Sequence, residues 1–134
     1  MKIFVFGNGN LSFEEFQEHY QQKMDKWLDD SQVSYVVCDF RGVDTLVMEY
    51  LKCKTPHVSV LHMMDRPRYL PDKYKTKVSQ WEIRGGFETD ADRDAAAIEM
   101  CSHFLAIDFN SNSKRISGTQ KNIDRCRELG KTEL

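Results

Sequence analysis

The sequence predicts an α/β fold of three layers: a Rossmann-like (flavodoxin-like), mainly parallel sheet of four to five strands flanked by helices. Short apolar runs rich in β-branched and aromatic residues alternate with longer segments whose apolar residues recur every three or four positions. Each helix then serves as a right-handed crossover between parallel strands. At 134 residues, the chain is expected to form one domain spanning residues 1–134.

The first strand is predicted at residues 2–6, where a short apolar run ends at the turn-forming segment Gly7–Asn10. Ser12 and Glu15 then form a capping box, which begins a helix. The apolar stripe of this helix consists of Phe13, Phe16, Tyr20, Met24, Trp27 and Leu28. A strand therefore leads through a glycine-bearing turn directly into a helix.

Two further strands are predicted at residues 33–40 and 57–64, because both segments are apolar and rich in valine. Between them, Asp44 is expected to cap a second helix that ends before Pro56. Residues 65–87 form a long excursion with a short strand near 78–83. Such an excursion is either a lid or binding loop, or a mobile segment without a role.

The C-terminal part predicts two more helices and one more strand. Thr89 can cap a helix over residues 90–101, and residues 103–109 read as the fourth full strand. Ser117 and Gln120 form a further cap, and the helix that follows ends at Gly130. The last four residues leave room for only a stub of a fifth strand, an exposed edge that a second copy of the chain could cover.

The net charge, the length of the apolar runs and the cysteine spacing indicate which binding partners and which cellular compartment to expect. The chain has 19 basic and 21 acidic side chains, a net charge of −2, and so lacks a bulk field that would attract nucleic acid or an anionic membrane. We therefore expect neither partner. No apolar run is long enough for a signal peptide or a membrane span, which favours the cytoplasm. The cysteines lack metal-ligand spacing, so we expect buried free thiols, no metal and no cofactor; their positions are Cys38, Cys53, Cys101 and Cys126.

Two glycine-bearing turns are candidate anion sites, because ligands of parallel sheets bind at the carboxyl ends of the strands. The loop Gly7, Asn8, Gly9 and Asn10 can bring backbone N–H groups close to a phosphate. Ser117, Gly118 and Thr119 leave N–H donors open at the start of the last helix, with Lys114 and Arg115 just upstream. A plain tight turn and a plain helix cap are the alternative interpretations.

Charged residues at two other element ends are further candidates. Asp39 closes the second strand, where a carboxylate could accept ribose hydroxyls. Asp92 and Asp94 flank Arg93 in the first turns of the third helix, where acids often only complement the helix dipole. A cation there opposes the dipole, and this favours a specific partner for Arg93.

Five short motifs occur in a familiar order: Gly85-Gly86-Phe87, Asp92-Arg93-Asp94, Phe104–Asp108, Ser117-Gly118-Thr119 and Leu129-Gly130-Lys131. This order resembles the broad Rossmann-like superfamily that includes LOG (lysine-decarboxylase-like) proteins, DprA-like domains and SLOG nucleotide sensors. The general layout is also similar to that of nucleoside 2-deoxyribosyltransferases.

The resemblance implies a site for a nucleotide or phosphoribosyl derivative. Gly7, Asn8 and Gly9 would meet the ligand from the first strand, Arg93 from the third helix, and the phosphate would lie against Gly118 and Thr119. In the LOG pattern a glutamate assists cleavage of the N-glycosidic bond, and the matching position here is Asn122. Asparagine cannot act as a carboxylate base, so hydrolysis by that route is not expected.

Three hypotheses about function follow. The first is a sensor or carrier domain that binds a nucleotide-like small molecule in a cleft at the strand C-terminal ends. The second is an enzyme, an N-glycosidic hydrolase or deoxyribosyltransferase, that uses Asp92, Asp94 or Asp108 in place of the missing glutamate. The third is an interaction protein without a ligand. The first two require the Gly7–Gly9 turn and Gly118 to face one pocket.

Overall fold

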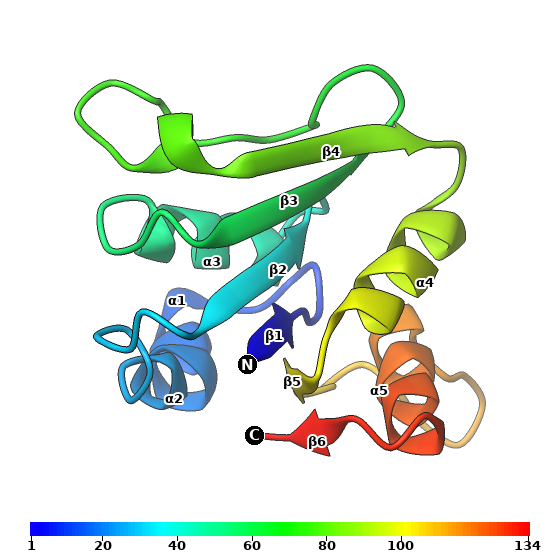
Figure 1. Ribbon diagram of the computed structural model, residues 1–134. Helices are drawn as coiled ribbons and strands as arrows, with labels where there is room; N and C mark the ends of the chain where they lie inside the picture. Colours follow the sequence, from blue (N-terminus) through cyan, green and yellow to red (C-terminus); the bar gives the residue numbers. More distant parts are fainter.

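The computed structural model describes residues 1–134 and contains one six-stranded sheet in which every pair of neighbouring strands is parallel (Figure 1). The strand order is β4-β3-β2-β1-β5-β6. The strands are β1 (Lys2–Val5), β2 (Ser34–Cys38), β3 (Val58–Met63), β4 (Glu82–Phe87), β5 (His103–Leu105) and β6 (Thr132–Glu133). The predicted fold class is confirmed, with six strands in place of four to five.

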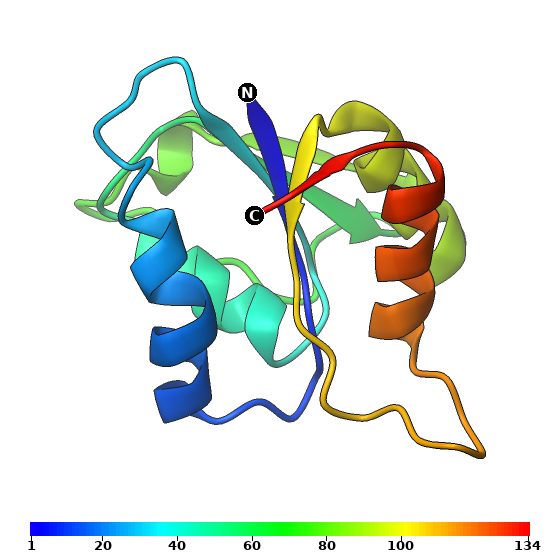
Figure 2. The same cartoon turned by 90° about the horizontal axis from the view of Figure 1, so that it is seen from below.

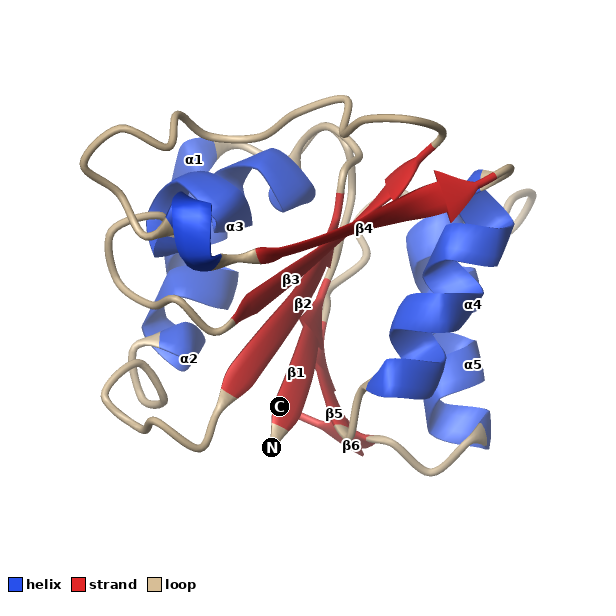
Figure 3. Ribbon diagram, turned by 45° about the horizontal axis from the view of Figure 1, so that its top comes forward, coloured by secondary structure: helices blue, strands red, loops and turns tan.

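Helices cover both faces of the sheet (Figure 3). One face carries α1 (Phe13–Phe16), a π-helical turn η1 (Gln17–Gln21), α2 (Gln22–Met24) and α3 (Val43–Leu51), and the other carries α4 (Asp90–Met100) and α5 (Gly118–Glu128). Each face has its own hydrophobic cluster, of 17 and 11 buried residues, so the sheet is buried on both sides as its apolar strands require. None of the helices combines the length and the apolar character needed to cross a bilayer.

Strand order reverses at β1. The chain runs outward from β1 through β2 and β3 to β4, and then returns to place β5 on the other side of β1. The loop after β1 leads to α1 on one face, whereas the loop after β5 leads to α5 on the opposite face, and both loops leave the same end of the sheet (Figure 2). A crevice opens where two such loops diverge, and this is the usual ligand position in open α/β sheets.

The first predicted helix is interrupted. Ser12 forms the expected capping box with Glu15, but the helix passes through η1 and ends at Met24, before Trp27 and Leu28. The buried residues Phe16, Tyr20 and Met24 lie four apart, a spacing that drifts around a helix of 3.6 residues per turn. A wider i→i+5 turn offsets that drift and keeps the three side chains on one face.

The predicted cap of α3 is wrong, because Gly42 and not Asp44 is the N-cap residue. Asp44 lies inside the first turn, and its Oδ2 accepts the backbone N–H of Phe40 at 3.0 Å. The backbone N–H of Val43 donates to Asn8 O at 3.2 Å, so the start of α3 is held against the loop that follows β1.

The predicted strand at 78–83 is misplaced. Val78–Gln80 form a short 3₁₀ turn. Val78 and the following Trp81 are both buried, and the Trp81 indole N–H donates to Thr55 O at 2.9 Å. The strand itself, β4, begins at Glu82 and forms an outer edge of the sheet. An exposed edge strand that contains Gly85-Gly86 lacks the apolar pattern by which strands are recognised.

Substitution of Gly42 should cost far more stability than substitution of Gly130. Both have positive φ, +77° and +73°, but a Cβ on Gly42 would lie about 2.5 Å from Asn8 O and Gly9 Cα, whereas one on Gly130 meets nothing within 4 Å. We expect Gly42→Ala to lower the free energy of unfolding by about 3 kcal/mol and Gly130→Ala by about 1 kcal/mol. Urea denaturation measures both, and equal losses would contradict this account of the α3 start.

Candidate functional site

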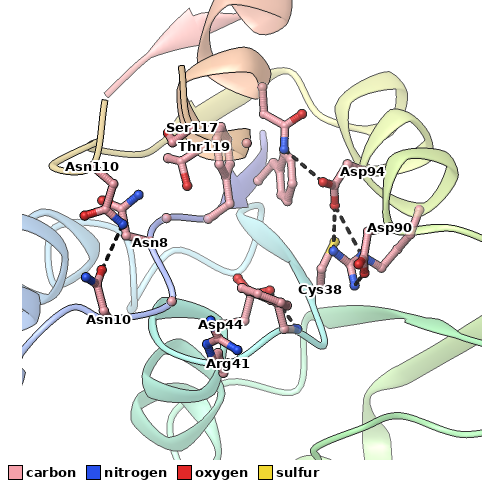
Figure 4. Close-up of a pocket in the computed structure, with 18 of the residues that line it drawn as sticks. Asn8, Asn10, Cys38, Arg41, Asp44, Asp90, Asp94, Asn110, Ser117 and Thr119 are labelled. Atoms are coloured by element: carbon pink, nitrogen blue, oxygen red, sulfur yellow. Dashed lines mark hydrogen bonds and ion pairs between the residues drawn. The ribbon is translucent and has the colours of Figure 1, made fainter. Parts of the chain in front are cut away.

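A cleft of about 410 Å³ lies at the carboxyl ends of β1, β2 and β5, where strand order reverses (Figure 4). Every predicted site residue except Asp39 and Asp92 lines it, so the two glycine-bearing turns face one pocket. The lining residues are Phe4, Phe6, Gly7, Asn8, Gly9, Asn10, Cys38, Phe40, Arg41, Asp44, Asp90, Arg93, Asp94, Asn110, Arg115, Ser117, Gly118, Thr119 and Asn122.

Asp108 joins the two walls of the cleft. Its Oδ1 accepts hydrogen bonds from Asn8 Nδ2 at 2.9 Å and from Ser117 Oγ at 2.6 Å, and its carboxylate also accepts the backbone N–H groups of Asn110 and Ser111. Partial burial acts to raise the pKa of Asp108, but hydrogen bonds from Ser111, Ser117 and Asn8 outweigh it and hold the pKa well below its usual range. The carboxylate is therefore ionised and bridges three segments.

Tyr20 links the chain segments that follow the neighbouring strands β1 and β5. Its hydroxyl donates to Phe6 O at 2.8 Å and accepts the N–H of Ile107 at 3.0 Å. Burial raises the pKa of Tyr20 well above its usual range, so the hydroxyl stays protonated. A Cβ on Gly7 would collide with this hydroxyl and with Val43. Gly7 is thus required by packing, which is independent of any ligand.

The start of α5 presents open backbone donors to the cleft. Ser117 Oγ accepts the N–H of Gln120 at 3.0 Å, which confirms the predicted cap. The N–H groups of Gly118 and Thr119 belong to the first turn and have no intrahelical acceptor. A Cβ on Gly118 would meet nothing within 4 Å, so the space in front of this turn is free. This wall can hold an anion.

Cationic and aromatic side chains lie on the rims of the cleft. The Arg41 guanidinium lies over the Phe40 ring, 5.1 Å from its centroid. Arg41 and Arg115 are exposed, both line the cleft, and neither forms an ion pair in the structure. Asn110 Nδ2 donates to Asn10 Oδ1 at 2.9 Å and links the remaining two rim segments (Figure 4). The unpaired guanidinium groups of Arg41 and Arg115 can therefore bind a negatively charged ligand.

Arg93 and Asp39, two predicted ligand contacts, are instead bonded to protein groups. The Arg93 side chain is 4% exposed and forms ion pairs with Asp39 at 2.8 Å, Asp90 at 2.7 Å and Asp94 at 2.9 Å. Asp39 also accepts hydrogen bonds from the backbone N–H and the guanidinium of Arg68. Burial acts to raise the pKa of Asp39, but these bonds with Arg68 and the nearby Arg93 lower it. Neither oxygen of Asp39 is therefore available for ribose hydroxyls.

The two predicted acids do not come together. Asp92 is exposed and lies outside the cleft, whereas Asp94 lines it. Asp94 Oδ1 is bonded to Arg93, and its Oδ2 accepts Asn122 Nδ2 at 3.0 Å (Figure 4). Asn122, at the position of the LOG glutamate, thus orients Asp94.

The sequence interpretation missed Asp44 as a residue of the cleft. Asp44 is 5% exposed and lines the cleft. Burial raises the pKa of Asp44 to about 7, against the opposing effects of the Phe40 N–H and of Arg93. An aspartate shortly after a turn glycine is typical of a helix cap, and for this reason the sequence did not indicate that Asp44 lines the cleft.

The cysteines are all free thiols, and Cys38, Cys101 and Cys126 are buried as predicted. Cys53 is exposed, which corrects the expectation that all four are buried. It follows the last turn of α3, where the chain leaves the core. No three His, Cys, Asp or Glu side chains are grouped so that they could hold a metal ion.

The fold is a DprA-like Rossmann-like fold, as a comparison with solved structures indicates. The chain is similar to DNA processing protein A from Helicobacter pylori, a protein that binds single-stranded DNA. The TM-score is 0.56 at 13% sequence identity, over 98% of this chain and 74% of that chain. No protein-family model matches the sequence. No curated protein matches it either.

This likeness corrects the predicted ligand and partner. The expectations of a nucleotide-like small molecule, of a deoxyribosyltransferase-like protein and of no nucleic-acid partner are contradicted, because the structural neighbour binds single-stranded DNA. The N-glycosidic enzyme and the ligand-free interaction protein gain no support. The net charge of −2 does not describe the cleft, because several acids pair with Arg93 while Arg41 and Arg115 on the cleft rim remain unpaired.

Asp108→Asn should lower the free energy of unfolding at pH 7 by about 2 kcal/mol, because charge-assisted hydrogen bonds across the cleft are lost. A carboxyl whose pKa is depressed by folding stabilises the fold above its unfolded pKa of about 3.9, and this contribution is lost as the pH falls further. The variant should therefore lose less stability between pH 5 and pH 3 than the unmodified protein, by urea denaturation.

Asp65→Asn is the matched control, because Asp65 is exposed and its side chain forms no hydrogen bond. Equal behaviour of the two variants would show that Asp108 does not hold the walls together.

Proposed function

We propose that this protein binds single-stranded DNA across the cleft at the carboxyl ends of β1 and β5. The observation that carries the proposal is the likeness of the whole fold to a protein that binds single-stranded DNA. The cleft supports it, since it combines open backbone donors, unpaired arginines and aromatic rings, which are the groups that single-stranded nucleic acid requires.

A backbone phosphate is best placed at the start of α5. Gly118 and Thr119 begin α5, at the positive end of its helix dipole, and both residues line the cleft. A Cβ on Gly118 would meet nothing within 4 Å, so there is space beside this turn. Arg115 lines the same wall, and Lys114 precedes it as a further exposed cation. Contacts of this kind bind the sugar-phosphate backbone whatever the base sequence.

Exposed aromatic rings beside the cleft supply stacking surfaces. Phe109 is 47% exposed and has His19 against it, with ring centroids 5.3 Å apart. Its backbone N–H donates to Asn8 Oδ1 at 2.8 Å, so the ring is anchored to the cleft wall. Phe40 also lines the cleft, and the guanidinium groups of Arg41 and Arg68 lie 5.1 Å and 5.6 Å from the centroid of its ring. Bases stack on such rings without regard to sequence.

Three broader expectations belong to the same proposal. Residues 1–134 act as one binding domain, which the single continuous sheet supports. The chain is kin to the wider SLOG and LOG group, which Gly118-Thr119 at a helix start supports. The protein works in a reducing compartment, the cytoplasm, where its free thiols stay reduced, and a second copy could cover the β6 edge.

Arg115→Ala and Arg41→Ala should each weaken binding of a mixed-sequence single-stranded oligonucleotide, because each removes one phosphate contact. We expect each variant to reduce the slope of log K against log salt by about 1, a sign that one fewer phosphate is neutralised. Fluorescence anisotropy over a series of salt concentrations measures this slope.

Arg125→Ala is the matched control, since Arg125 lies on α5 and is paired with Glu128 at 3.2 Å, outside the cleft. It should leave both affinity and slope nearly unchanged. If the unmodified protein shows no salt-dependent binding of single-stranded DNA, the proposed function is wrong.

Phe109→Ala should weaken binding of the same oligonucleotide by about 1–3 kcal/mol, the usual contribution of one stacked base. Tyr74→Ala is the control, because Tyr74 is also aromatic and 75% exposed, but its backbone N–H donates to Asp72, outside the cleft, whereas that of Phe109 donates to the cleft residue Asn8. Titrations at a single salt concentration measure both. An equal effect of the two substitutions would remove Phe109 from the proposed binding surface.

A further inference from the structure

The cleft has two ends of opposite charge. Its outer rim carries Arg41 and Arg115, whereas Asp44 and Asp94 line its interior. A phosphate is repelled by these carboxylates and belongs at the rim. The interior instead suits a neutral group with N–H bonds to donate.

Both oxygens of Asp94 already accept hydrogen bonds, Oδ1 from Arg93 and Oδ2 from Asn122 Nδ2, so Asp94 is less open to such a group than Asp44. Arg93 is bonded to three carboxylates, and its side chain is only 4% exposed. The choice of ligand group therefore depends on Asp44.

Asp44 has one engaged oxygen and one open oxygen. Oδ2 accepts the Phe40 N–H at 3.0 Å, and Oδ1 accepts no hydrogen bond. The residue is 95% buried, with a relative exposure of 5%, and it lines the cleft (Figure 4). Tyr35 Oη is the buried side-chain atom that lacks a hydrogen-bond partner, so Asp44 Oδ1 is not sealed inside the protein. It is open to the cleft that Asp44 lines, and an N–H of a ligand can reach it there.

We propose that Asp44 Oδ1 accepts a hydrogen bond from the exocyclic amino group of a base in the bound strand, and so favours cytosine and adenine over thymine and uracil. This inference rests on the proposed function. Acidic side chains accept in this way from cytosine N4. Thymine and uracil carry a carbonyl oxygen at the same ring position, and its lone pairs would face those of the carboxylate.

The test is run at about pH 8.5, where Asp44, with its pKa of about 7, is ionised and can only accept hydrogen bonds. It compares oligonucleotides of about 12 nucleotides, within the site sizes of single-strand-binding folds, that contain either deoxycytidine or deoxyuridine. The two bases differ in the amino or carbonyl group at ring position 4 and in N3, which is an acceptor in cytosine and carries a hydrogen in uracil. The pyrimidin-2-one strand described below shares N3 with cytosine and so isolates the amino group. The unmodified protein should bind the deoxycytidine strand about tenfold more tightly, which corresponds to about 1.4 kcal/mol.

Asp44→Asn should abolish or invert this preference. The amide oxygen can still accept the Phe40 N–H, while the amide N–H₂ takes the place of the open oxygen and suits the uracil carbonyl. Asp92→Asn is the matched control, because Asp92 is an exposed aspartate outside the cleft, and it should retain the preference for deoxycytidine.

A second measurement does not depend on the folding of the Asp44→Asn variant. An oligonucleotide of pyrimidin-2-one deoxynucleosides, with hydrogen in place of the amino group, should bind the unmodified protein about as weakly as the deoxyuridine strand. Equal affinities for all three strands, with Arg115→Ala still weakening each, would overturn base reading by Asp44 and leave DNA binding intact. Binding of none of them would overturn the proposed function itself.

Discussion

The cleft depends on the hydrogen bonds that Asp108 accepts. β1 and β5 are neighbours in the sheet, but the loops that follow them lead to helices on opposite faces. Asn8 and Ser117 both donate to the same oxygen of Asp108, at 2.9 Å and 2.6 Å, and this holds the two loops at a constant separation. Because Ser117 is also the cap of α5, the bridge aims the open N–H groups of that helix into the cleft.

Ion pairing decides where charge is available. Arg93 draws Asp39, Asp90 and Asp94 into one network, and this leaves α4 with a buried cation in its first turns, against the helix dipole. The attraction of three carboxylates offsets that cost and the cost of burial. The carboxylates of this network are neutralised by Arg93. The unpaired Arg41 and Arg115 therefore dominate the charge at the rim of the cleft. A nearly neutral chain can therefore present a locally basic surface.

The candidate site was predictable where its residues also have a local role. Ser117 reads as a cap, and the glycines at positions 7 and 9 mark a turn after a strand; both features are visible within a few residues of sequence. Asp39 and Asp44 were assigned to the wrong environments, because their partners Arg68, Arg93 and Phe40 could be chosen only after the chain had folded. The ligand class was predicted wrongly because it was judged from net charge and short motifs.

The sequence by itself determined the alternation of strands and helices, the three caps at Ser12, Thr89 and Ser117, and hence the layered fold, because periodicity and capping are properties of neighbouring residues. The tertiary structure alone decided the strand order, the edge position of β4, and which side chains share the cleft. Those features depend on contacts such as Asn8 with Asp108, which are separated by 100 residues. No local pattern records a pairing over that distance, since its free energy comes from the folded arrangement as a whole.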